Sequence, residues 1–344
     1  MKPALYRYLK GAGAVIVCAV ALALPSLLGD SYYLHLLILA GMNAVLAMTF
    51  VMLLRTGLVS LAIAAFMGIG ATTTAALTVK LGWSFWAALP ASVVATALIA
   101  LIVGYPLLKN AGFTFVLLTA VLGMLIPQIF GSVDYLGGFS GLQGVPAPDP
   151  ISIGSLTVTF GSKSSYYYLL LALFAIVTFV FWRLYKARTG RAWMTIGLNP
   201  PLAESTGVDV FRYRLLAFVI ASAAAGLMGC FYASYIGSVV PTQFTVFKTI
   251  YIHIYAIMGG IPFALLGPFV GAAFLTWVPE FLRGVPYLEP IIMGVLFILL
   301  ILFLPDGLLS LVRRQEGEGL LLTVFRGLVG VAKRLPVISR ERSG

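Results

Sequence analysis

Uninterrupted apolar runs of about 20 residues follow one another along most of this chain of 344 residues. A helix of that length crosses the roughly 30 Å hydrocarbon core of a bilayer. Only helices and closed barrels satisfy all backbone hydrogen bonds in lipid, and these runs are too long for barrel strands. The composition agrees: 61% of the residues are hydrophobic and 10% are charged, against about 45–50% and about 25% in soluble domains. The sequence therefore predicts an all-α, polytopic membrane protein.

About ten membrane-spanning segments, some of them discontinuous helices, are predicted from the apolar runs. They cover residues 12–28, 34–54, 57–79, 84–104, 112–130, 164–182, 214–236, 242–258, 263–282 and 287–304. Lys2, Arg7 and Lys10 precede the first run, and no convincing small-residue cleavage site follows it. We therefore expect an uncleaved first helix and one transmembrane domain over residues 1–312.

The basic residues predict the orientation, because Lys and Arg collect on the cytoplasmic side of a membrane. With a cytoplasmic N-terminus, four of the 22 basic residues (Lys80, Lys163, Lys248 and Arg283) fall outside and the other 18 fall inside. Both chain ends are then cytoplasmic. A nucleic-acid binder would concentrate its basic residues on a water-exposed face, so membrane orientation explains the net charge of +11 and no nucleic-acid partner is expected.

Three segments outside the predicted helices are long. Residues 131–163 are rich in Gly, Pro and Ser and are predicted to form a periplasmic loop. Residues 183–213 combine basic residues, Asn199-Pro200-Pro201 and a helix-compatible stretch from Leu202 to Val210, which predicts a cytoplasmic elbow that a docking partner could grip. Residues 313–344 predict a basic cytoplasmic tail, either an interfacial amphipathic helix or a disordered end.

The stretch Thr242–Leu282 is interrupted by Met258–Pro262 and again by Gly267-Pro268. Gly and Pro in such positions break helices. Broken helices at membrane depth are packed in protein or line a cavity, so this region is a candidate wall of a translocation pathway. A short aqueous loop between two helices explains the same residues equally well.

Polar side chains within apolar spans are the other candidates for lining a pathway. They are Asn43, Thr49, Thr56, Ser60 and Gln128. Half or more of such residues are expected to serve ordinary helix packing.

Groups suited to metal binding or thiol chemistry are few. His35, His253 and Glu280 have no partner at the spacing of a metal site, so structural roles are expected for them. Cys18 and Cys230 lie in separate apolar runs and are expected to be small packing residues. We therefore expect no metal and no disulfide framework.

One tetrad resembles a catalytic motif. Gly138-Phe139-Ser140-Gly141 matches the Gly-x-Ser-Gly pattern of intramembrane serine proteases, with His253 as a conceivable base. Such a serine should lie at a helix end within the membrane, whereas Ser140 falls in a loop rich in Gly and Pro. No catalytic residue is therefore assigned, although an intramembrane enzyme stays an alternative.

A source of energy is also missing from the chain. No Gly-rich loop followed by Lys and Ser or Thr is present, so the chain lacks a P-loop for ATP. ATP and Mg would be bound by partner subunits, and no cofactor is expected here. An ion-coupled carrier usually has charged residues within its spans. Mid-span charges are absent from the predicted segments, which disfavours a self-sufficient secondary transporter, although backbone carbonyls can bind sodium.

The elbow and several shorter motifs together resemble the LivM-type permeases of bacterial branched-chain amino acid ABC importers. In the elbow these are Thr189–Trp193, Ala203–Val208 and Tyr213–Phe218. The other motifs, in the same order as in the family, are Ala65–Ala71, Gly137-Gly138 with Gly141-Leu142 and Gly144–Pro146, Tyr232–Tyr235, Gly267-Pro268 with Gly271-Ala272, and Leu304-Pro305 with Gly307-Leu308. They span about residues 40–311.

The resemblance implies a subunit of an inner-membrane importer without its own ATPase site. Its partners would be a second, LivH-type permease, two cytoplasmic ATPase subunits and a periplasmic substrate-binding protein. The family's short coupling helix falls in the elbow, and the residues assigned to ATPase coupling are Arg191, Leu202, Ala203, Glu204, Ser205, Thr206 and Gly207. Glu204 would make a polar contact and Gly207 would form the turn.

The chain also departs from the family pattern. Leu58 and Ala62-Ile63 stand where the family often has Gln and a Gly-His pair, and Phe50 replaces a common Asn. The interval Gly259–Pro268 is one residue longer than usual. A more apolar pathway wall would suit branched-chain or other apolar amino acids, or a less polar or aromatic small carboxylate.

Overall fold

The computed structural model describes residues 22–25, 32–109, 112–153, 156–261, 263, 265–281, 291, 294–295, 297–298 and 307–308. The predicted first and tenth spans lie largely outside this part of the chain, and the predicted tail lies wholly outside it. The described residues are mostly helical, with four very short strands, which confirms the predicted fold class.

Six described helices are long and apolar enough to cross a membrane. They are α2 (Tyr32–Leu54), α3 (Ile63–Ala75) with the π-turn η1 (Ala76–Lys80), α4 (Phe85–Leu108), α5 (Phe113–Ser132), α6 (Lys163–Lys186) and α9 (Val210–Ile236). The predicted spans 242–258 and 263–282 are shorter helices, α10 (Val246–Gly259) and α11 (Leu266–Phe281). About ten spans are therefore not confirmed.

Hydrogen-bonding caps fix several of these boundaries. The side chains of Ser84 and Ser162 accept from backbone amides in the first turns of α4 and α6, and Asp209 does the same for α9. Such caps satisfy amides that have no partner within the helix. Gly237, at φ +76°, ends α9, because glycine adopts the left-handed conformation without steric cost.

The helix in the predicted span 57–79 begins six residues later than predicted, because residues 57–62 are not helical. Gly57 (φ +73°) turns the chain after α2, and α3 starts at Ile63. Side chains of other helices accept hydrogen bonds from backbone amides at this boundary. The Leu61 amide donates to Thr119 Oγ1 of α5 at 3.1 Å, and the Ala64 amide donates to Thr249 Oγ1 of α10 at 3.0 Å.

Glycines allow the central helices to pack with their backbones in contact. A Cβ on Gly229 of α9 would lie 1.9 Å from the carbonyl oxygen of Met67 in α3. A Cβ on Gly70 would lie 2.1 Å from the carbonyl oxygen of Gly226. Small residues at helix contacts are the usual means of close packing in membranes.

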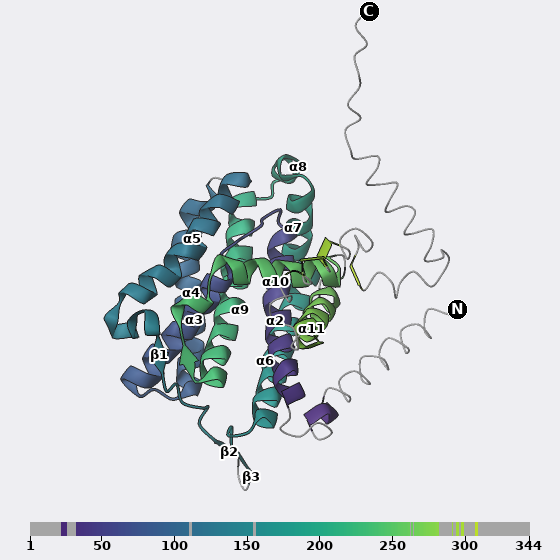
Figure 1. Ribbon diagram of the computed structural model, residues 1–344. Helices are drawn as coiled ribbons and strands as arrows, with labels where there is room; N and C mark the ends of the chain where they lie inside the picture. Colours follow the sequence, from purple (N-terminus) through teal and green to yellow (C-terminus); the bar gives the residue numbers. More distant parts are fainter. Residues whose placement is uncertain are drawn as a thin grey trace, which may run out of the picture.

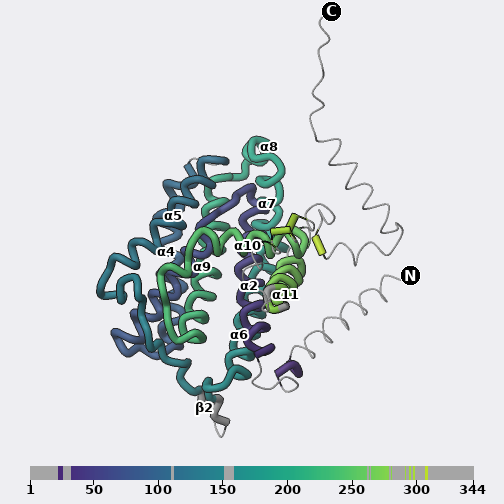
Figure 2. Tube along the Cα trace, viewed as in Figure 1, coloured from purple at the N-terminus to yellow at the C-terminus, as the bar shows by residue number. Residues whose placement is uncertain are grey.

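The predicted interruption near residue 260 is confirmed. α10 ends at Gly259, Gly260 has φ +108°, and α11 begins at Leu266. The two helices meet at Gly259 and Gly267, since a Cβ on Gly259 would lie 1.7 Å from the Gly267 carbonyl oxygen. The break is therefore packed within the protein. Figure 2 shows α10 crossing the direction of α2, which it contacts.

Two connections lie at opposite ends of the bundle (Figure 1). The helices α7 (Arg188–Leu198) and α8 (Pro200–Ser205) form the top end in this view. At the other end lies the hairpin of β2 (Ile151–Ile153) and β3 (Leu156–Val158). Two short 3₁₀ turns, η2 (Asp134–Leu136) and η3 (Gly138–Ser140), lead into β1 (Leu142–Gln143), which pairs antiparallel with β4 (Ser238–Val239) after α9; η4 (Pro241–Gln243) follows.

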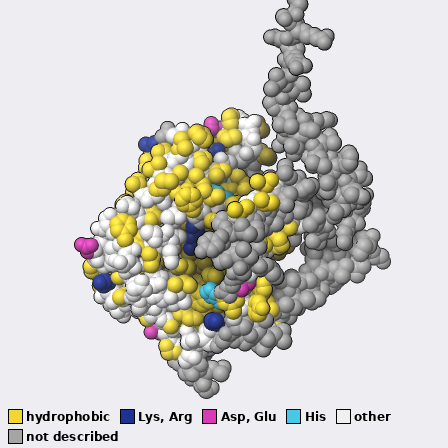
Figure 3. All heavy atoms as spheres, in the orientation of Figure 1, with side chains coloured by type: hydrophobic (Ala, Val, Ile, Leu, Met, Phe, Trp, Pro, Cys, Tyr) yellow, Lys and Arg dark blue, Asp and Glu magenta, His cyan; other side chains and the backbone are white. Residues whose placement is uncertain are grey.

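The outer helices expose apolar side chains. Ile102 of α4, Phe113 of α5 and Phe179 of α6 are 70%, 76% and 63% exposed. Figure 3 shows hydrophobic side chains over much of one face, with charged ones scattered singly. Apolar surface of this extent would be unfavourable in water and suits lipid. The protein is therefore a multi-pass membrane protein.

Candidate functional site

The elbow folds into two short helices, which we call the coupling tip (residues 188–207). α7 follows α6 almost directly, and α8 follows Asn199. The Asn199 side chain accepts from the Leu202 amide at 3.1 Å, and Pro200 occupies the first helical position, so α8 starts there. Gly207 (φ +83°) turns the chain into α9. The predicted helical stretch 202–210 was therefore wrong in extent, since α8 ends at Ser205.

The residues predicted to couple to an ATPase lie together at this tip. Ala203 is buried, whereas Arg191, Leu202, Glu204, Ser205, Thr206 and Gly207 are exposed. The sequence did not predict α7, and so it missed two further apolar side chains here. Met194 is 57% and Leu198 86% exposed, four residues apart on one helix face.

Trp193 anchors the tip to the bundle. Its side chain is fully buried, and its Nε1 donates to the Tyr213 carbonyl oxygen of α9 at 2.9 Å. Ile196, Ala203 and Val210 form a separate small apolar cluster that joins α7, α8 and the start of α9. We therefore expect the tip and the start of α9 to move as one unit.

We expect Trp193→Phe to loosen this anchor. The variant loses a buried hydrogen bond and leaves unfilled volume, which costs about 1–3 kcal/mol and lowers the melting temperature by a few degrees. Thermal unfolding in detergent, followed by tryptophan fluorescence, measures the change. Trp182→Phe on α6 is the control, because Trp182 is 42% exposed. Equal melting temperatures for both variants would show that Trp193 is not an anchor.

The turn between α2 and α3 joins the tip to the core. Arg214 Nε of α9 donates to the Thr56 carbonyl oxygen at 3.1 Å. The Arg55 guanidinium lies 4.2 Å from the ring centroid of Tyr185 at the end of α6. A Cβ on Gly197 of α7 would lie 2.3 Å from the Arg55 carbonyl oxygen. α6, α7 and α9 therefore all contact residues 55–57.

The five polar residues proposed to line a pathway lie in different surroundings. Thr49 is buried within α2 and donates to the Leu46 carbonyl oxygen, and Thr56 is buried in the turn after α2 and donates to the Leu53 carbonyl oxygen. Ser60 is buried beside the start of α3, where its Oγ accepts from the Ala62 amide at 3.3 Å. Gln128 is exposed on α5. Only Asn43, of these five, lines the cavity described next.

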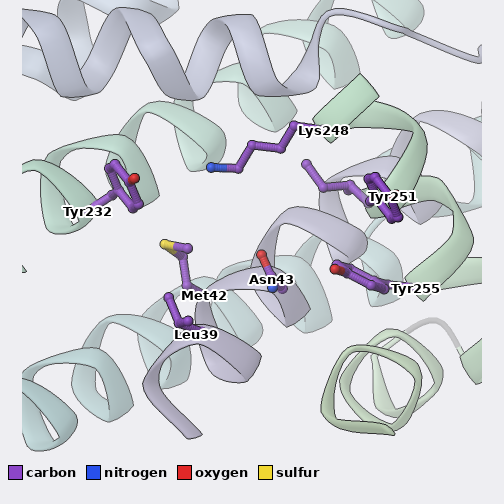
Figure 4. Close-up of a pocket in the computed structure, with 8 residues that line it drawn as sticks. Leu39, Met42, Asn43, Tyr232, Lys248, Tyr251 and Tyr255 are labelled. Carbon is purple, nitrogen blue, oxygen red and sulfur yellow. The ribbon is translucent and has the colours of Figure 1, made fainter. Parts of the chain in front are cut away.

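A cavity of about 310 Å³ lies between α2, α9 and α10 (Figure 4). Its walls are mainly apolar and aromatic, and its lining residues are Leu39, Met42, Asn43, Tyr232, Lys248, Tyr251, Ile252 and Tyr255. Asn43 is at the middle of α2, so the cavity lies about halfway along that helix, and it is open on one side, where Tyr251 is 45% exposed. Its size is in the lower range of small-molecule sites, which start at about 300 Å³.

Lys248 is the cationic group of this cavity. Figure 4 shows its side chain extending from α10 towards Tyr232, over Met42 and Asn43. Its Nζ lies 4.7 Å from the ring centroid of Tyr232 and 5.2 Å from that of Phe244. No carboxylate in the described part of the chain pairs with it. Lys248 was counted among the residues on the outer side of the membrane, and the structure places it on α10 beside this cavity. The position of Lys248 inside the predicted span 242–258 was the available signal.

The histidine in α10 has a structural contact. His253 Nε2 donates to the Ser60 carbonyl oxygen at 3.0 Å, and its ring lies 4.0 Å from that of Phe50. Ser140 is exposed in η3, and its carbonyl oxygen accepts from Gln143. Among the described residues no hydrogen bond joins His253 to Ser140, and no group of three potential metal ligands occurs.

Long apolar helices, a short helical tip at one end and a cavity between α2, α9 and α10 suit a subunit of a membrane transport system. The chain belongs to the family of permease components of branched-chain amino acid transport systems, whose model matches residues 32–304. It is thus the permease component of an ABC-type system, as its resemblance to LivM predicted.

Individual relatives carry two kinds of name. The chain is 26% identical over 303 residues to the high-affinity branched-chain amino acid permease proteins LivM of Salmonella typhimurium and Escherichia coli K12, covering 82% of this chain and 69% of each relative. It is 28% identical over 263 residues to the autoinducer 2 import permease protein LsrC of Escherichia coli SMS-3-5, covering 72% and 69%. No solved structure matches the chain.

Proposed function

We propose that this chain is one half of the translocation pathway of a bacterial importer for branched-chain or other apolar amino acids. It lies in the inner membrane with the coupling tip and both chain ends in the cytoplasm. A LivH-type permease completes the pathway, two ATPase subunits bind ATP and Mg, and a periplasmic binding protein delivers the solute.

The coupling tip is the observation that carries the proposal. It presents Leu198 and Leu202 to solvent on two helices that Trp193 holds rigidly against α9. Exposed apolar side chains on an ordered surface suit a protein partner. In the proposed orientation this surface faces the cytoplasm, where the ATPase is.

The hydrogen bonds suggest how motion at the tip would reach the cavity. The tip and α9 contact the turn at residues 55–57. The segment that follows this turn is hydrogen-bonded to α10. The Ser60 carbonyl oxygen accepts from His253, and the Ala64 amide donates to Thr249. α10 carries four of the residues that line the cavity. Rigid-body movement of the tip would therefore shift one cavity wall, as alternating access requires.

The cavity lining supports the cargo assignment. Leu39, Met42 and Ile252 are apolar, which suits an aliphatic side chain. Tyr232, Tyr251 and Tyr255 favour a second candidate within the same family, an aromatic or otherwise less polar small carboxylate.

Reconstitution tests the proposal directly. We expect the purified chain alone to transport no leucine in liposomes, with or without an ion gradient, because it has no drive of its own. The assembly with its second permease, ATPases and binding protein should import leucine only with ATP. Import of leucine by the chain alone under an ion gradient would establish a secondary carrier and refute the proposal. Phenylalanine and a neutral sugar serve as competing cargoes.

A further inference from the structure

We infer that Lys248 binds the carboxylate of the transported solute within the cavity between α2, α9 and α10. This inference rests on the proposed function and makes it more specific, since it names the chemical group that the permease itself recognises. The transported solutes would be small carboxylates with an apolar body.

The first argument is the cost of placing an ammonium group there. A cation within a membrane bundle is rare and usually faces a counter-ion or an aqueous path. Lys248 is half-buried, and no described carboxylate neutralises it. Its contacts in the described part of the chain are the ring faces of Tyr232 and Phe244, which attract a cation weakly and provide no strong acceptor for its three N–H donors.

The second argument is where the ammonium points. Lys248 extends into the space bordered by Met42, Asn43 and Tyr232 (Figure 4). Among the described residues, the side chains that line this space include one cation and no anion. An anionic acceptor is therefore the ligand group that the cavity lacks, and a carboxylate satisfies an ammonium by charge-assisted hydrogen bonds.

The third argument is the rest of the lining. Tyr251 and Tyr255 follow Lys248 along α10 at about one and two helical turns, on the same face. Ile252, Leu39 and Met42 complete an apolar wall. A solute with its carboxylate on Lys248 would lay its apolar body against this wall. An amino acid would place its ammonium near the electron-rich faces of the tyrosines.

The test compares Lys248→Met with Lys248→Arg in the assembled transporter. We expect Lys248→Met to lower the leucine import rate at subsaturating substrate by at least about tenfold, because a charge-assisted hydrogen bond is lost. Lys248→Arg, which keeps the charge, should retain part of the wild-type import rate. Stimulation of the ATPase by the loaded binding protein should persist in both variants, which shows that the assembly is intact. Wild-type import by Lys248→Met would overturn the inference.

A second measurement does not depend on transport. The full wild-type chain in nanodiscs is treated with an amine-reactive reagent, and labelling of Lys248 is followed by mass spectrometry. Leucine and isovalerate, which carry a carboxylate, should protect Lys248, whereas the matched alcohol leucinol should not. Lack of protection by both carboxylates, or equal protection by leucinol, would overturn the inference. Absence of leucine import by the wild-type assembly would instead refute the proposed function, so the two failures are distinguishable.

Discussion

Replacing Gly229 with Ala is expected to disrupt the central helix pair of the bundle. The new methyl group would lie 1.9 Å from the Met67 carbonyl oxygen and 2.8 Å from the Ala71 amide nitrogen. Both are backbone atoms of α3, so no side-chain rotation relieves the clash, and α3 and α9 must separate. Overpacking of this kind costs about 3 kcal/mol, although alanine raises helix propensity by about 1 kcal/mol. The net cost of about 2 kcal/mol should lower the melting temperature in detergent by about 3–4 °C.

Gly41→Ala on α2 is the matched control. It makes the same substitution in a membrane helix, but the nearest atom to the new Cβ is Leu170 Cδ2 at 2.8 Å, the rotatable end of a side chain. This variant should melt within about 2 °C of the wild type, or slightly above it because of its helix propensity. If Gly229→Ala were equally stable, backbone contact between α3 and α9 would not hold the bundle together.

The lengths of the central helices were predictable, but their contacts were not. The predicted spans 34–54 and 112–130 agree with α2 and α5 to within about two residues. An apolar run reports that a segment crosses lipid, because hydropathy is a property of the whole segment. Whether a glycine such as Gly229 meets another backbone depends on which faces pack together. That information lies in the tertiary arrangement.

The start of α3 shows why one boundary could not be predicted. Residues 57–62 are nearly as apolar as the neighbouring membrane helices, yet their backbone groups form hydrogen bonds to side chains of α5 and α10. Thr119 and His253, which supply these bonds, are distant in the sequence. Hydropathy and local propensity therefore favoured a helix that the long-range bonds replace.

The candidate site was predicted in part. The coupling tip was located by its resemblance to a family motif, and Asn43 by its polarity within an apolar span. α7 was missed because Gly190 and two arginines obscure its buried apolar face, which includes Ala192, Trp193 and Ile196. Lys248 was counted on the outer side of the membrane, although it lies within the predicted span 242–258. Its inward direction follows from the packing of α10 across α2.

Replacing Leu202 with Asp at the coupling tip is expected to uncouple transport from ATP hydrolysis. Leu202 is 56% exposed, so folding loses little when it becomes polar. An apolar anchor at the centre of an interface, in contrast, contributes about 2 kcal/mol or more to binding, and a desolvated carboxylate adds to the loss. We expect the variant to insert and melt like the wild type, and to retain less than about one tenth of ATP-driven import and of bound ATPase subunit.

Leu81→Asp is the matched control for this prediction. Leu81 is 58% exposed, and it lies just before α4, whose first residues Phe85 and Trp86 bond to Asp149 of the connection opposite the tip. The same substitution there should leave the ATPase bound, because the proposed ATPase surface is at the other end of the bundle. Leu202→Met, which keeps the apolar contact, should also retain coupling, and Glu204→Lys should weaken it through its reversed charge. Normal ATPase binding by Leu202→Asp would place the docking surface elsewhere. The coupling tip would then not transmit ATPase movement to the cavity, as the proposed alternating access requires.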